Sequence, residues 1–160
     1  MARQFSLPYQ IPPVSLLAPQ ADAAGRVSPY RSLANALKAW VVVEVNQGNA
    51  ATVLLSLLQA QDNLGTNSKA TGAVPIWLQA ATGTSDANVQ QTAAATFTPS
   101  AVLANKIVIF EITPEMCLDL VNGFNHVAIS TGASNAANIT RADLFILAAI
   151  QAATPPSAYV

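Results

Sequence analysis

Charged residues are scarce in this chain of 160 residues. Lys and Arg contribute seven residues and Asp and Glu eight, so 9% of the chain is charged and the net charge is −1. An ordinary soluble domain has roughly 25% charged residues. The basic residues are scattered, which disfavours a nucleic-acid-binding surface, and no polybasic or strongly amphipathic stretch points to a membrane surface. Such a weakly charged surface is easily buried against a neighbour, so the composition favours a subunit of an assembly, with a polar secreted domain as the alternative.

Cysteine and histidine are each represented once, by Cys117 and His126. One cysteine excludes an intrachain disulfide, and one histidine excludes a two-histidine metal site within the chain. A Cys–His nucleophilic pair could form in principle. Because Cys117 lies among apolar residues of a short helix and His126 alternates with apolar strand positions, we favour structural roles for both.

The carboxylates form no recognisable site either. Glu115 and Asp119 are four residues apart and would share a helix face, but helix-end electrostatics explains them. No calcium loop, phosphate-binding glycine loop, nucleophile elbow or zinc spacing is present. Trp40 and Trp77 could stack on sugar rings, although we expect both to pack internally. We therefore predict no enzyme activity and no catalytic, cofactor-binding or metal-binding residues.

The N-terminal segment is rich in proline. Residues 1–26 include four prolines, so we expect neither a helix nor a central strand but an extended arm. The arm lacks an apolar run long enough for a signal peptide, and no part of the chain has the apolar length of a membrane span, so we expect synthesis in the cytoplasm. Its large apolar side chains need a surface to lie on, either the flank of the same domain or a partner. These candidate interface residues are Phe5, Leu7, Tyr9, Ile11, Val14, Leu16 and Leu17.

Regular strand signals begin at residue 27 and predict one antiparallel β-sandwich, jelly-roll-like, over residues 27–152, followed by a proline-rich tail at 153–160. Residues 39–46 alternate so that Val41, Val43 and Val45 face the core, and they form a predicted hairpin with residues 51–60. Pro75 suggests that residues 74–80 form an edge strand. The other predicted strands are residues 89–97, 106–112, 126–131 and 142–149.

A short helix is predicted between two of these strands. Thr113 would be its N-cap, Pro114 its first residue and Glu115 a favourable charge at its positive end. The helix should stop at Asn122 and Gly123, a pair that favours left-handed backbone.

Several phrases of the sequence resemble a family of tailed-bacteriophage auxiliary head proteins, also called capsid decoration or cement proteins. The longest is LANALKAWVVVEVNQGNAATVLLSL at residues 33–57, followed by QAQDN at 59–63. KIVIFEI at 106–112, NGFNHVAISTG at 122–132 and SNAANI at 134–139 add to it. The resemblance covers roughly residues 27 to 150 and does not include the arm.

This resemblance implies a virion protein on the exterior of an icosahedral capsid, bound to the major capsid protein as a trimer that clamps neighbouring subunits. It implies no cofactor, and no functional residue can be transferred one by one. Two alternatives stay open. The chain could be another virion structural subunit, from the tail or the neck and connector, or a carbohydrate-binding sandwich module.

Overall fold

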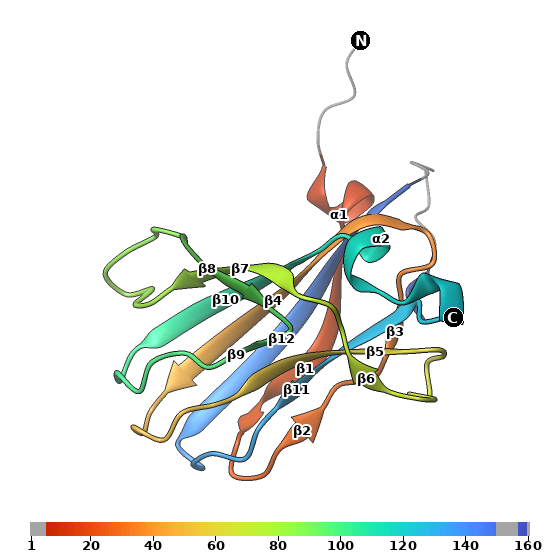
Figure 1. Cartoon of the computed structure of the whole chain (residues 1–160). Coiled ribbons are helices and arrows are strands. Elements are labelled where there is room, and N and C mark those ends of the chain that lie inside the picture. The colour runs from red at the N-terminus through yellow and green to blue at the C-terminus, as the bar shows by residue number, and fades with distance from the viewer. Residues whose placement is uncertain (1–5, 150–156, 160) are drawn as a thin grey trace.

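A computed structural model describes residues 6–149 and 157–159 and has two antiparallel sheets that pack face to face (Figure 1). The predicted all-β sandwich is confirmed. Sheet A has the spatial order β1 (Pro13–Ala21), β12 (Asn138–Ala148), β4 (Ala36–Gln47), β10 (Asn105–Ile112), β7 (Val74–Gln79) and β8 (Val89–Ala94). Sheet B is built on β11 (His126–Thr131) and β5 (Leu55–Ala60), to which short strands pair: β2 (Arg26–Val27), β3 (Arg31–Ser32), β6 (Lys69–Ala70) and β9 (Thr96–Phe97).

The core lies between the inner faces of the two sheets. Val41, Val43 and Val45 of β4 are fully buried, as their alternation predicts, and so are Phe110 of β10 and Leu57 of β5. β1, β7, β11 and β12 also contribute buried apolar residues, so one cluster of apolar side chains joins both sheets.

The predicted hairpin between residues 39–46 and 51–60 is wrong. Both edges of β4 are occupied, by β10 and β12, and β5 pairs in the other sheet with β11. The intervening turn therefore crosses between the sheets. The buried side-chain amide of Gln47 stabilises this turn by donating hydrogen bonds to the carbonyls of Asn49 at 2.7 Å and Ala51 at 2.6 Å. Local turn residues signalled a reversal, but they could not specify which sheet the chain would enter.

The edge position predicted for residues 74–80 is also wrong, because β7 lies between β10 and β8. Pro75 is accommodated because pairing with β10 begins only at Ile76 and because the register with β8 shifts between Val74 and Ile76. A proline without an amide donor is tolerated at such an irregularity.

The N-terminal segment corrects the predicted arm. Residues 13–21 are β1, an edge strand of sheet A that pairs with β12, so the sandwich starts well before residue 27. An edge strand can contain Pro13 and Pro19 because along one of its two edges the backbone makes no hydrogen bonds to a neighbouring strand. A single helical turn, α1 (Leu7–Gln10), precedes the strand; Pro8 fits there because the first turn needs no amide donors. The predicted boundary at residue 152 lies outside the described residues.

The predicted short helix is shorter than expected. α2 (Pro114–Cys117) starts at Pro114 after the N-cap Thr113, as predicted. The chain then leaves the helix and forms a 3-10 turn, η1 (Leu120–Asn122), which ends at Gly123 with φ of 79°. The left-handed stop at Gly123 is confirmed.

Candidate docking surface

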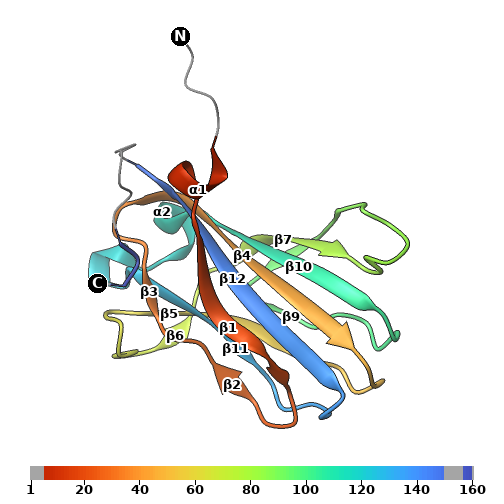
Figure 2. The ribbon, with the colours of Figure 1, turned by 180° about the vertical axis from the view of Figure 1, so that it is seen from behind.

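The outer face of sheet A carries an apolar strip that crosses β12, β4, β10 and β7, strands that lie side by side in Figure 2. Trp40 on β4 is opposite Phe145 on β12, Val42 is opposite Ile109 on β10, and Ile109 is opposite Trp77 on β7. All five side chains are half-buried. They alternate with the core residues of the same strands, so they point away from sheet B. A sheet face that is open to solvent usually carries polar residues, whereas these five positions are apolar.

A shallow groove runs along this strip beneath α1. It is lined only by apolar side chains, those of Leu7, Ile11, Trp40, Val42, Ile109 and Phe145, and it has a volume of about 290 Å³. Leu7 belongs to α1 and is 44% exposed. The helix therefore forms one wall of the groove, and the sheet forms its floor.

Paired charges border the apolar strip. At one end, Lys38 forms an ion pair with Glu111, which also accepts a hydrogen bond from the indole nitrogen of Trp77 at 3.0 Å. The hydrogen bond from Lys38 holds the pKa of the Glu111 carboxyl below its usual value. At the other end, Arg141 pairs with Asp143 at 2.8 Å. An apolar centre with a polar rim is the anatomy of a protein interface.

The predicted interface residues divide between this groove and the core. Leu7 and Ile11 line the groove, whereas Val14 packs against the core. Leu16 and Leu17 are buried, 5% and 6% exposed, because register shifts in β1 turn both consecutive side chains inward. Their assignment to an external interface is therefore wrong, and the flank of the domain itself covers them. Phe5 lies outside the described residues, as does the side chain of Tyr9.

The residues considered for catalysis are held in structural contacts. Cys117 is buried, which raises the pKa of its thiol to about 11, and the thiol donates to the Thr113 carbonyl at 3.3 Å. His126 is buried in β11, with its Nδ1 atom 2.6 Å from the side-chain oxygen of Asn125. A thiol with a raised pKa is a poor nucleophile at neutral pH.

Glu115 and Asp119 do not share a helix face, since α2 ends between them. The Asp119 carboxylate pairs with Lys69 at 2.6 Å and accepts hydrogen bonds from the amide of Asn122. These contacts, with Lys69 first, keep the pKa of Asp119 below its usual value. Within residues 6–149 and 157–159, no three His, Cys, Asp or Glu residues are grouped to hold a metal ion.

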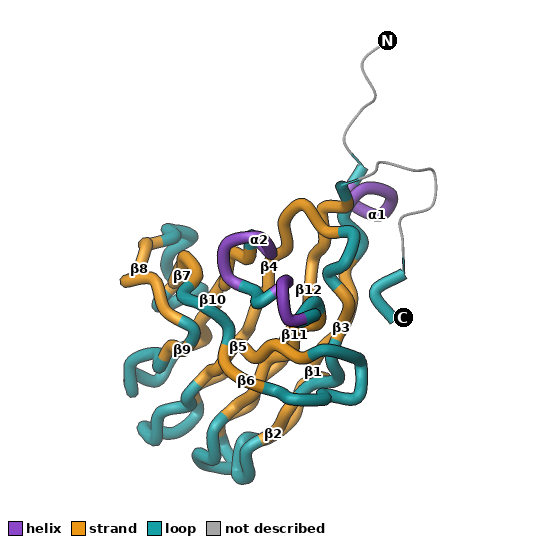
Figure 3. Tube along the Cα trace, turned by 45° about the vertical axis from the view of Figure 1, so that its right-hand side comes forward, coloured by secondary structure: helices purple, strands orange, loops and turns teal. Residues whose placement is uncertain are grey.

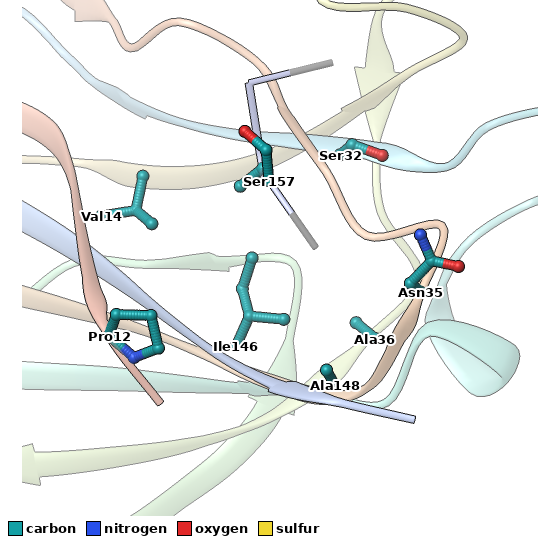
Figure 4. A pocket seen from close by; sticks show the side chains of 9 residues that line it. Pro12, Val14, Ser32, Asn35, Ala36, Ile146, Ala148 and Ser157 are labelled. Atoms are coloured by element: carbon teal, nitrogen blue, oxygen red, sulfur yellow. The ribbon is translucent and has the colours of Figure 1, made fainter. Parts of the chain in front are cut away.

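A second hollow lies between the start of β1, the end of β12 and the C-terminal residues 157–158 (Figure 4). Its volume is about 40 Å³, and Pro12, Val14, Ala36 and Ile146 supply most of its apolar lining. A space of that size holds a water molecule or two rather than an organic ligand. The groove on sheet A is therefore the better candidate for a binding surface.

Sequence reasoning missed this groove although the signal was present. Trp40 and Val42 share the face of β4 that the valine pattern assigns to solvent. The expectation that both tryptophans are internal is corrected, since Trp40 and Trp77 lie half-buried on the outer face.

The fold is an antiparallel β-sandwich with an apolar groove on one outer face. No protein-family model matches the chain, and neither the curated proteins nor the solved structures give a significant match. Among the described residues, no helix has the length and apolar character needed to cross a membrane.

Proposed function

We propose that this chain is a non-enzymatic structural protein of a bacteriophage virion that decorates and cements the outer surface of the capsid. The observation that carries the proposal is the apolar strip on sheet A, with the groove at its centre and paired charges at its ends. The partner proposed for the assembly is the major capsid protein, with further contacts between copies of the chain. The resemblance of residues 33–57 and the later phrases to auxiliary head proteins selects this class of assembly.

The physical properties of the surface suit a cement. Few charges must be desolvated when the strip is covered, so binding should be insensitive to salt. Burial of Trp40, Val42, Ile109 and Phe145 supplies the hydrophobic driving force, at roughly 25 cal/mol per Å² of apolar area removed from water. Each contact can be modest, because several linked copies bind with avidity. A clip across subunit junctions then resists the outward pressure of packaged DNA.

The proposal is tested in the phage that encodes the chain. Virions made without the gene should lose their DNA at a lower temperature than wild-type virions. Purified protein added to them should bind and restore the heat resistance. The Val42→Lys variant should do neither, because a charge on the strip would have to be buried. Ile139→Lys, on the same face of sheet A but outside the groove, is the matched control and should do both. Purified virions without the chain would refute the proposal.

The same virions test the alternative of a tail or neck subunit. Antibodies against the chain would then label the tail or the portal vertex and not the capsid surface. The glycan-binding alternative gains one observation, the outward position of Trp40 and Trp77 with the Lys38–Glu111 pair between them. Such a module should change its tryptophan fluorescence on titration with soluble oligosaccharides, and a Trp40→Ala variant should lose the response. A structural subunit should show no response.

A further inference from the structure

We propose that the seam between the edges of the two sheets is a binding site for a short peptide turn in which a serine is followed by a small residue and then an aromatic one. In this structure the site is closed by the chain's own residues 157–159, which have the sequence Ser-Ala-Tyr. The inference does not depend on the proposed function, since none of the residues that line the groove on sheet A takes part in it.

The first feature of the site is an open strand edge. β3 pairs on one side with β11, and no other described strand pairs with it. An unpaired strand edge presents backbone donors and acceptors that another segment can use. The amide of Ser32 donates a hydrogen bond to the Ala158 carbonyl at 3.1 Å, and Figure 3 shows residues 157–159 beside β3. A backbone bond of this kind suits a peptide segment.

The second feature is the hollow beneath this segment, between the start of β1 and the end of β12 (Figure 4). Ala158 lines the hollow and is only 6% exposed, with Val14 and Ile146 on the opposite wall. The volume of about 40 Å³ is the space that remains while residues 157–159 are in place, so their departure enlarges it. The position of Ala158 therefore accepts a small side chain and rejects a long charged one, whose charge would have to be buried.

The third feature is a cation that selects an aromatic ring. The guanidinium carbon of Arg31 lies 4.0 Å from the centre of the Tyr159 ring. Such a contact is favourable because the cation faces the negative face of the ring. Tyr159 is 59% exposed, so its ring covers the guanidinium from outside and is not part of the core. Arg31 thus favours an aromatic residue directly after the small one.

A local turn places both side chains in position. The Ser157 hydroxyl accepts a hydrogen bond from the Tyr159 amide at 3.1 Å, a contact that serine makes with backbone two residues ahead. Ala158 can then enter the hollow while Tyr159 lies over Arg31. The serine belongs to the recognised pattern because it shapes the turn before binding.

The contacts described for the 157–159 segment are few enough to be exchanged. They are one backbone hydrogen bond to β3, one buried alanine and one largely exposed cation–π contact. A partner segment with the same pattern can make all three. Residues 157–159 are therefore a built-in competitor that such a partner must displace.

Fluorescence anisotropy of the full-length chain tests this site, with a fluorescein-labelled peptide of the sequence of residues 154–160, TPPSAYV, as the probe. The wild type should bind the peptide weakly. In the Ala158→Arg variant the built-in segment cannot enter the hollow, and the peptide should bind about tenfold more tightly, since a tethered competitor acts at an effective concentration of roughly 1 mM. Tyr159→Ala changes a largely exposed side chain and should strengthen peptide binding by about two- to fivefold.

Matched controls locate the binding. Peptides with arginine in place of Ala158 or alanine in place of Tyr159 should bind more weakly than the parent peptide. Arg31→Met, added to Ala158→Arg, should weaken binding of the parent peptide by about two- to fivefold. Arg141→Met in the same background changes an exposed arginine outside the hollow and should have no effect. Circular dichroism should show the wild-type fold for each variant.

Other outcomes overturn the inference. If neither Ala158→Arg nor Tyr159→Ala binds the peptide, residues 157–159 are a fixed part of the fold and the seam is not a peptide site. Equal affinities of the wild type and Ala158→Arg would mean that the peptide binds elsewhere. Wild-type dimers that dissociate on addition of the peptide, measured by sedimentation, would mean that the segment docks on a second copy and does not close its own chain's site.

Discussion

Arg26 and Asp22 form an ion pair at the edge of the sandwich, with a guanidinium nitrogen 3.2 Å from a carboxylate oxygen. The Asp22 side chain is fully buried and also accepts a hydrogen bond from the Thr140 hydroxyl. Arg26 donates in addition to the carbonyls of Gln20 at 3.1 Å and Thr140 at 2.9 Å. The pair therefore ties the end of β1 to β12, and it makes the N-terminal segment part of the fold rather than an appendage.

Arg26→Met should destabilise the protein strongly, because it leaves the Asp22 carboxylate buried without its counter-charge. We expect a loss of about 3 kcal/mol in the free energy of unfolding, typical of a buried pair that loses one partner. Urea denaturation followed by fluorescence measures it. The matched control is Arg141→Met in the same sheet, since the Arg141 side chain is 51% exposed and its partner Asp143 is half-buried; the loss should stay below about 1 kcal/mol. Equal losses in the two variants would contradict the structural role given to the pair.

Two truncations should separate the strand from the residues before it. Removing residues 1–12 leaves β1 intact, so the shortened chain should fold and unfold cooperatively near the wild-type temperature. Removing residues 1–21 deletes Leu16 and Leu17 from the core, and each such side chain is worth about 2 to 5 kcal/mol. That chain should show no cooperative thermal transition by circular dichroism. If both truncations unfolded alike, β1 would not be the stabilising element.

Alternation along the sequence was enough to locate the central strands. The strand predicted at residues 106–112 is observed at Asn105–Ile112, and that at residues 126–131 is observed with the same bounds. Both runs have strong β propensity, and the valine pattern of β4 identified its core face correctly. Such local signals report which residues are extended and which face is buried.

Pairing and the use of the outer face could not be predicted in this way. The turn at Gln47 looks like a hairpin, but which strands flank β4 depends on contacts with β10 and β12, far along the chain. Prolines excluded a central strand for residues 13–21 without excluding an edge strand. The outer apolar strip was missed because both tryptophans were expected to pack internally, although alternation places Trp40 and Val42 on the face of β4 that points away from the core.

Gly48→Ala should be destabilising because the connection between the sheets is tightly packed there. A Cβ atom at Gly48 would lie 2.4 Å from the Ala137 carbonyl oxygen, closer than any real contact, so the backbone would have to move. We expect a loss of about 1 to 3 kcal/mol, as for other overpacked sites. Gly83→Ala is the control, since nothing lies within 4 Å of its added Cβ, and it should change stability by less than about 1 kcal/mol. Thermal denaturation of both variants makes the comparison, and a neutral Gly48→Ala would show that the connection can relax.

Cys117 should react slowly with thiol reagents in the folded protein. Its burial raises the pKa to about 11, so almost no thiolate exists at neutral pH, and the sulfur is shielded from solvent. Absorbance of a disulfide reagent at neutral pH should show little reaction until denaturant is added, and then one equivalent per chain. Rapid reaction without denaturant would mean that the α2 region opens readily.

The buried amine of Lys106 should make stability depend on alkaline pH. Its side chain is fully buried and donates to the Val102 carbonyl, and burial lowers its pKa below the usual 10.5. Below the folded-state pKa, the folded protein bears the whole penalty of a buried charge. Between that pKa and 10.5 the unfolded chain binds more protons than the folded one, so the free energy of unfolding rises with pH. Lys106→Met has no such proton to lose, so its stability relative to the wild type should fall as pH rises through this window. Urea denaturation of both proteins between about pH 7 and 10.5 measures the difference, at about 1.4 kcal/mol per unit of pKa shift, and parallel curves would refute the assignment.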